Sequence, residues 1–144
     1  MNNIIQTFLQ KQHIASICGV HTNSTPFIFS CFYVVQENVL LFKSSPHSNH
    51  IESMHLHAAI AGTVIANQKN ALRFSGAQFE GHFLGSAKVH GIETSSYYAQ
   101  HPLAVAIPGE IYAVELTGIK LTEHTLGVMK KHVWMAHMEL KQSD

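Results

Sequence analysis

Hydroxyl, amide and imidazole side chains gather in one short stretch that follows an apolar run. This 43–50 stretch is Lys43-Ser44-Ser45-Pro46-His47-Ser48-Asn49-His50. Pro46 suits a first helical position, and Asn49 followed by Glu52 has the spacing of a capping box, so a helix is expected to begin here. The free N–H groups and partial positive charge of a helix start attract anions such as phosphate. Two interpretations stay open, an anion site and an ordinary capped helix.

The chain holds 12 histidines, an unusually large number for its length. His47 and His50 can share one helix face, but His55 and His57 cannot share a face with each other. No close cysteine pair and no His-Glu-x-x-His pattern accompanies them. We therefore expect no metal site, and we expect most histidines to serve as polar surface groups.

Two cysteines, Cys18 and Cys31, lie in apolar runs that resemble strands. A hairpin centred near Ser24 and Thr25 would place them roughly opposite each other. Two cysteines do not make a disulfide framework, and a reduced cysteine in such a run behaves as a small apolar residue. We expect both to be reduced.

Composition limits the class of protein. Of 144 residues, 46% are hydrophobic and only 12% are charged, which predicts a compact chain with part of its surface covered by another subunit. The formal net charge of zero argues against nucleic acid as a partner. No segment has the length of a membrane span, and the N-terminus lacks the pattern of a signal peptide. The sequence thus predicts a cytoplasmic protein that binds neither nucleic acid nor a membrane.

Periodicity predicts a chain that alternates short helices with many strands. Helices are expected over 3–13, 46–57 and 93–101, with 103–108 ambiguous between a helix and irregular structure. Strands are expected over 14–20, 27–35, 39–43, 58–66, 71–89, 111–121 and, at the end of a tail, about 126–134. Glycines along the 71–89 run suggest bulges in a closing barrel. These features predict one α+β, mainly β domain over 1–144, a six-stranded barrel with short flanking helices.

The order of these elements resembles the pyridoxamine 5′-phosphate oxidase-like FMN-binding split-barrel superfamily, and most of all a small branch of uncharacterised bacterial proteins within it. Three stretches carry the resemblance: Ser48-Asn49-His50 at a helix start, Gly76-Ala77-Gln78-Phe79-Glu80-Gly81 in the long strand, and residues 125–134 near the end. The resemblance covers nearly the whole chain.

The resemblance implies a homodimer that binds FMN at the subunit interface. It places the flavin phosphate against the turn that holds Lys43, Ser44, Ser48, Asn49 and His50. The flavin ring would lie along the strand with Ser30, Phe32 and Tyr33, and the strand around Gly76 and Gln78 would line the same cleft. Lys131 and Trp134 would approach the ring from the partner subunit.

The sequence departs from the oxidase pattern at its basic residues. After the helix-opening serine the oxidase has a basic residue and a lysine, where this chain has Asn49 and His50, and Ser30 and Ser75 stand near the places of its phosphate-binding arginines. Substrate-binding residues of the oxidase are not recognisable. Two functions stay open, a flavin-dependent oxidoreductase of an unknown small molecule and a non-catalytic dimer that binds or senses FMN or haem.

Overall fold

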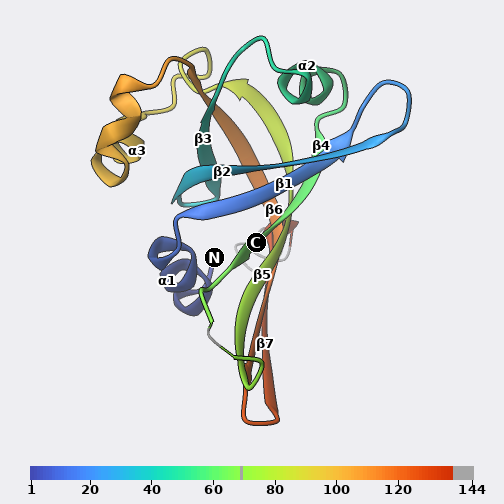
Figure 1. The fold of residues 1–144 in the computed structure, drawn as a ribbon, viewed down its shortest axis with the longest axis vertical. Helices are drawn as coiled ribbons and strands as arrows, with labels where there is room; N and C mark the ends of the chain where they lie inside the picture. Colours follow the sequence, from blue (N-terminus) through green and yellow to red (C-terminus); the bar gives the residue numbers. More distant parts are fainter. Residues whose placement is uncertain (69, 138–144) are drawn as a thin grey trace.

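Seven antiparallel strands form one sheet, and six of them close into a ring (Figure 1). The order is β3-β2-β1-β4-β5-β6-β7, and a further pairing of β3 with β6 closes the ring. The strands are β1 Ile14–Val20, β2 Pro26–Gln36, β3 Val39–Ser44, β4 Ala59–Ile65, β5 Arg73–Ser86, β6 Glu110–Thr125 and β7 Val128–Met135. The structure is a computed structural model that describes residues 1–68 and 70–137. The predicted α+β, mainly β class is confirmed.

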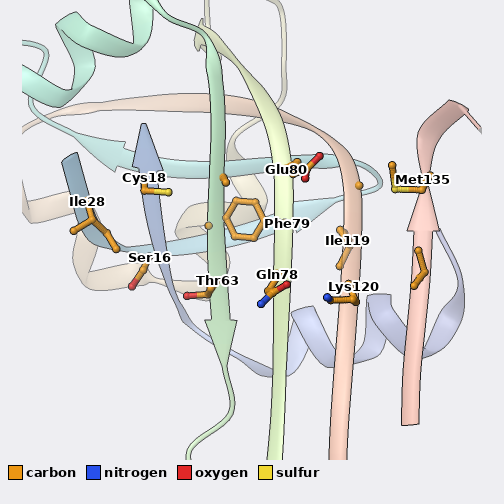
Figure 2. A pocket seen from close by; sticks show the side chains of 14 residues that line it. Ser16, Cys18, Ile28, Thr63, Gln78, Phe79, Glu80, Ile119, Lys120 and Met135 are labelled. Atoms are coloured by element: carbon orange, nitrogen blue, oxygen red, sulfur yellow. The ribbon is translucent and has the colours of Figure 1, made fainter. Parts of the chain in front are cut away.

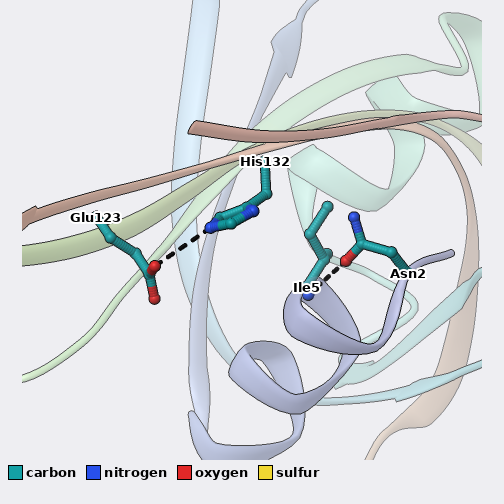
Figure 3. Close-up of polar contacts among 4 residues, drawn as sticks. All are labelled: Asn2, Ile5, Glu123 and His132. Atoms are coloured by element: carbon teal, nitrogen blue, oxygen red, sulfur yellow. Dashed lines mark hydrogen bonds and ion pairs between the residues drawn. The ribbon is translucent and has the colours of Figure 1, made fainter. Parts of the chain in front are cut away.

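Short helices lie around the sheet: α1 Asn3–Lys11, α2 Asn49–Leu56, α3 Ser95–Gln100 and the 3-10 helix η1 Pro102–Ala106. The carboxamide of Asn2 accepts a hydrogen bond from the backbone N–H of Ile5 at 2.9 Å and caps α1 (Figure 3). η1 resolves the segment that the sequence left ambiguous. In the described part of the chain, no helix has both the length and the apolar character needed to cross a membrane.

The last predicted strand is β7, which pairs with β6 along its whole length and lies outside the ring of six strands. β6 runs well beyond the predicted end at Leu121. Its first part, Glu110–Glu115, pairs with β3, while its later part pairs with β7. One edge of β6 thus pairs with both β3 and β7, while its other edge pairs with β5. β5, β6 and β7 continue together past the ring as an arm (Figure 1).

The helix that follows the 43–50 stretch begins later than expected. α2 starts at Asn49 with Ser48 as its N-cap residue, so Pro46 lies in the preceding turn and not in the helix. That turn closes on itself, since the backbone N–H of Ser48 donates to the carbonyl of Ser45 at 3.2 Å. The Ser48 hydroxyl also donates to the Ser45 carbonyl, at 2.8 Å. These two hydrogen bonds hold residues 45–48 in a turn, so the helix does not extend toward Pro46.

The two cysteines do not lie opposite each other, contrary to the expectation. The β1–β2 register pairs Cys18 with Ile28 and Cys31 with Ala15. Cys31 donates from its thiol to the Ala15 carbonyl at 3.8 Å, and burial raises its pKa to about 12. The hairpin centre lies at Asn23, and this shift places the two thiols on opposite faces of the sheet.

The apolar core has two parts that share strand β3. The larger part fills the ring beneath α1 and α2 and includes Leu40 and Phe42, while a smaller part under α3 includes Leu41. Successive side chains of a strand point to opposite sides. Lys43 therefore continues on the side of Leu41, and Ser44 continues on the side of Phe42. This alternation decides where the polar residues of the 43–50 stretch point.

Candidate functional site

Three polar side chains of the 43–50 stretch meet where β3 ends and α2 begins. The Ser44 hydroxyl lies 2.9 Å from Nε2 of His50, and the Ser48 hydroxyl lies 3.3 Å from the same nitrogen. The two hydroxyl oxygens are 3.5 Å apart. We call these three residues the Ser–His cluster. It brings two hydroxyls and one imidazole to one partly buried point, a set of donors suited to a phosphate oxygen.

An aromatic stack holds the imidazole of the Ser–His cluster in place. The ring of Phe29 stacks on His50 with centroids 3.9 Å apart. Phe27 lies beside both, and it also contacts His21. Nδ1 of His21 lies 2.6 Å from the hydroxyl of Ser53, a buried residue of α2. The tip of the β1–β2 hairpin is thereby joined to the helix that carries His50.

The environment of His50 favours its neutral form. Burial, and after it the nearby His21, lower the pKa of His50 below its ordinary value of 6.5. The folded protein therefore binds fewer protons at this site than the unfolded chain near that pH. The stability that neutral His50 contributes is complete above about pH 6.5 and is lost as the pH falls through the folded pKa.

We predict that His50→Gln flattens the acid dependence of stability. Between about pH 7.5 and about pH 5, wild type should lose more free energy of unfolding than the variant, since a glutamine side chain at this position cannot take up a proton. Urea denaturation at both pH values, at one protein concentration, measures this loss. His47→Gln is the matched control, because His47 is exposed in the same turn, and it should behave as wild type. An equal loss in wild type and His50→Gln would contradict the prediction.

The structure separates Lys43 and Asn49 from the Ser–His cluster. The Lys43 ammonium donates to the carbonyl of Ala104 in η1 at 2.8 Å and lies 5.1 Å from the ring centroid of Tyr98. It therefore fastens η1 to β3 on the other side of the strand. Asn49 is exposed and lines a small surface hollow beside His21. Of the three residues in the Ser–His cluster, only His50 can carry a positive charge.

Strand β2 has a free edge beside the Ser–His cluster. β2 pairs with β3 only over Tyr33–Gln36, although β1 pairs with β2 over Pro26–Phe32. Beyond Phe42, β3 leaves β2 but stays paired with β6. The β3-facing backbone groups of residues 26–32 therefore have no strand partner among the described residues, and the hydroxyl of Tyr97 donates to one of them, the Phe32 carbonyl, at 3.4 Å. Such an edge can accept a flat polar ligand.

The predicted ring-contacting residues of β2 point in two directions. Ser30 and Phe32 are exposed on the outer face of the sheet, and Ser30 lies 3.2 Å from the hydroxyl of Ser16. Tyr33 points into the core, where its hydroxyl donates to the carbonyl of Leu9 at 2.6 Å. A ligand on the outer face could contact Ser30 and Phe32 but not the Tyr33 ring of the same subunit.

A shallow hollow of about 520 Å³ lies on the outer face (Figure 2). Small side chains make its floor, and Ile28, Lys120 and Met135 stand around it. Gln78 lines this hollow from β5, while the predicted Gly76 lies two residues further along the same strand. A side chain at Gly76 would collide with the ring of Phe74. The structure thus places Gln78 in the hollow of the outer face and not beside the Ser–His cluster.

The two predicted residues of the C-terminal region lie in different surroundings on β7. Lys131 pairs with Thr122 on the arm and is exposed. Trp134 is only 6% exposed and packs in the core of its own subunit. Beside Lys131, Nε2 of His132 lies 3.3 Å from a carboxylate oxygen of Glu123 (Figure 3). Lys131 is thus exposed on the arm, whereas the Trp134 ring faces the core of its own subunit.

Sequence reasoning missed the residues that position the site. The contacts of Phe29 with His50 and of His21 with Ser53 join positions far apart in the chain. Strand alternation could have shown that Phe29 faces away from Ser30, but no local signal indicates its partner. In the described residues, no group of three or more His, Cys, Asp or Glu side chains is placed to hold a metal ion.

Sequence comparison finds relatives that span nearly the whole chain. A UPF0306 protein of Yersinia pseudotuberculosis is 30% identical over 142 residues, covering 93% of this chain and 96% of the relative. A UPF0306 protein of Photorhabdus laumondii is 28% identical over 134 residues, covering 91% and 93%. No model of a protein family matches the chain.

Structure comparison finds the same fold in proteins of low sequence identity. The haem storage protein HutZ of Vibrio cholerae has a TM-score of 0.70 at 10% identity, covering 87% of this chain and 96% of that chain. An FAD-binding protein of Mesorhizobium loti has a TM-score of 0.67 at 12% identity, with the same coverage. A haem-binding protein of Mycobacterium smegmatis has a TM-score of 0.65 at 8% identity, covering 92% and 58%. At these identities the likeness shows the fold.

Proposed function

The chain belongs to the UPF0306 family, and from this premise we propose that it is a cytoplasmic flavin-binding protein, one split-barrel domain over residues 1–144 that holds FMN as a homodimer. One observation carries the proposal: the Ser–His cluster lies next to the free edge of β2. A phosphate and a flat ring that belong to one molecule need such neighbouring sites. The FAD-binding protein of the same fold supports a flavin as the ligand.

The residues of the Ser–His cluster fit FMN, but they would bind its phosphate weakly. Ser44 and His50 would exchange their mutual hydrogen bond for bonds to phosphate oxygens, and the Ser48 hydroxyl would turn from the Ser45 carbonyl to a phosphate oxygen. Asn49 adds an exposed amide at the start of α2. Since Lys43 is held by η1, no lysine of the 43–50 stretch supplies charge to the cluster. We expect loosely held FMN that is partly lost on purification.

Along the free edge, backbone groups near Ser30 and Phe32 would bond the polar rim of the flavin. The exposed ring of Phe32 lies against His101, with centroids 5.3 Å apart, and offers an apolar surface at that end. Lys131 of the partner subunit would approach from the opposite side. A bound flavin supplies hydride transfer, and the protein orients it and excludes water. The proposed activity is oxidoreduction of a small molecule.

The second candidate is a dimer that binds or senses FMN or haem without turnover. The lack of a lysine at the Ser–His cluster favours it, because a neutral site holds a phosphate less firmly and suits exchange of the ligand. Two of the proteins with the same fold bind or store haem. Bleaching of the yellow FMN complex by NAD(P)H would favour the oxidoreductase, and a complex that stays yellow would favour the binding protein.

Titration with FMN is the first test of the proposed function. FMN fluorescence should be quenched as FMN enters a protein site that excludes water. The expected result is saturable quenching with one FMN for each chain. A colourless protein that FMN does not titrate would contradict both proposals that involve FMN, and haem titration followed by absorbance would then test the remaining one.

We predict that the purified protein is a dimer. Its charged share of 12% is low, and large apolar side chains such as Ile28 and Phe32 are exposed in the single chain. Two-fold dimers are the commonest assemblies of such chains. Light scattering at micromolar concentration should give twice the mass of 16.0 kDa. A monomer mass would contradict the prediction.

A further inference from the structure

The strand register builds one continuous outer face across six strands. Residues that pair directly on neighbouring strands point to the same side. One row of such residues is Ser30, Ser16, Thr63, Gln78, Lys120 and Val133, from β2 to β7. The next row is Ile28, Cys18, Ala61, Glu80, Gly118 and Met135. Together the two rows hold nearly all of the residues that line the hollow in Figure 2.

Large apolar side chains project from both ends of these rows. Ile28 is 72% exposed and Val133 is 57% exposed. Phe32 and Ile14, which pair with each other in the following row, are 54% and 52% exposed. Small residues such as Ala61 and Gly118 lie between these ends beside polar side chains such as Gln78, so the face has apolar ends and an open, mixed centre. Exposed large apolar side chains gathered on one face mark an association surface.

The hollow has one acidic and one basic residue, Glu80 and Lys120. They stand on neighbouring strands and one row apart, because Glu80 pairs with Gly118 and Lys120 pairs with Gln78. No ion pair joins either of them to another described residue. If the face is covered, each charge must find an opposite charge, since an unpaired buried charge is strongly destabilising.

We propose that a second copy of this chain covers the outer face, and that Glu80 of each copy pairs with Lys120 of the other. A single two-fold axis that passes between β5 and β6 exchanges the two positions and so creates both pairs at once. Such an interface is self-complementary, as a two-fold dimer requires. This inference rests on the proposed dimer and names the surface that forms it.

The equal numbers of acidic and basic groups favour a second copy over another partner. A surface that binds a nucleic acid or an acidic protein has an excess of basic groups, whereas the hollow at the centre of this face has one group of each sign. A ligand bound at the rim, along the free edge of β2, is compatible with a partner over the centre. The partner would then close the site from the side of Ser30 and Phe32.

Charge reversal tests the pairing directly. Glu80→Lys and Lys120→Glu should each weaken dimerisation by at least about thirtyfold, because every two-fold interface then has two like-charged pairs. The double variant exchanges the charges and should restore the dimerisation constant to within about tenfold of wild type. Sedimentation velocity over a range of concentrations measures the constant, and circular dichroism checks the fold. Lys88→Glu, an exposed reversal away from the face, should change nothing.

The reactivity of Cys18 gives a second readout, since Cys18 lines the hollow. In the wild-type dimer a maleimide should label Cys18 slowly. Each single charge reversal should raise the labelling rate of Cys18, and the double variant should return it toward the wild-type rate. Cys31 stays unreactive on the buried side. Single reversals that leave the dimer intact, or a double variant that does not recover, would overturn the pairing while FMN titration still tests the proposed function. A monomeric wild type would overturn the dimer and this inference together.

Discussion

FMN should bind this protein more tightly than riboflavin, by about 2–4 kcal/mol, the value of one or two hydrogen bonds to a charged group. The two flavins differ only in the phosphate, so the difference reports the contact made by the Ser–His cluster. At 1.4 kcal/mol for each factor of ten, we expect about a thirtyfold to about a 700-fold ratio of dissociation constants. The ratio should shrink as salt is added, because a partly exposed phosphate contact is screened.

His50→Ala should remove most of that difference. The variant loses the nitrogen that lies 2.9 Å from the Ser44 hydroxyl and leaves riboflavin affinity nearly unchanged. His47→Ala is the matched control, since His47 is exposed in the same turn, and it should bind both flavins as wild type does. Fluorescence quenching with both flavins in all three proteins measures the effect. Equal affinities for the two flavins in wild type, or equal losses of both in His50→Ala, would show that the phosphate lies elsewhere.

Phe42→Ala should destabilise the protein by about 3–5 kcal/mol, the usual cost of removing a buried aromatic ring. Phe42 is fully buried and lies against Phe29, Phe83 and Tyr112. It also holds the end of β3 that presents Ser44. The rings around Phe42 are rigid and held in a close-packed core, so we expect the upper part of the range. Urea denaturation at a fixed protein concentration measures the change.

Two further variants test whether the loss of stability comes from the buried ring of Phe42 or follows from any substitution in the protein. Phe42→Leu keeps an apolar side chain in the core, so it should cost less than Phe42→Ala and preserve FMN affinity in the folded protein. Leu56→Ala removes an exposed side chain at the end of α2 and should change stability by no more than about 0.5 kcal/mol. A Phe42→Ala variant as stable as Leu56→Ala would contradict the structure at this point in the core.

Local pattern was enough to predict most elements in their order. The β1 run Ile14–Val20 matches the expectation at both ends, since apolar and β-branched residues alternate between turn residues. Boundaries failed where a hydrogen bond outside the element decided them. α2 begins at Asn49 because the Ser45–Ser48 turn closes first, and β6 extends past Leu121 because β7 pairs with it. Such partners leave no trace in a single window of sequence.

By itself the sequence determined the class of fold, the order of its elements and the polar character of the turn after β3, because these depend on residue types and short spacings. The tertiary structure alone decided which of those residues act together. Alternation along β3, coupled to two separate cores, sends Lys43 to η1 and Ser44 to His50. The register across the sheet brings Glu80 and Lys120 onto one face. Both outcomes depend on contacts between distant segments, which form only when the whole sheet closes.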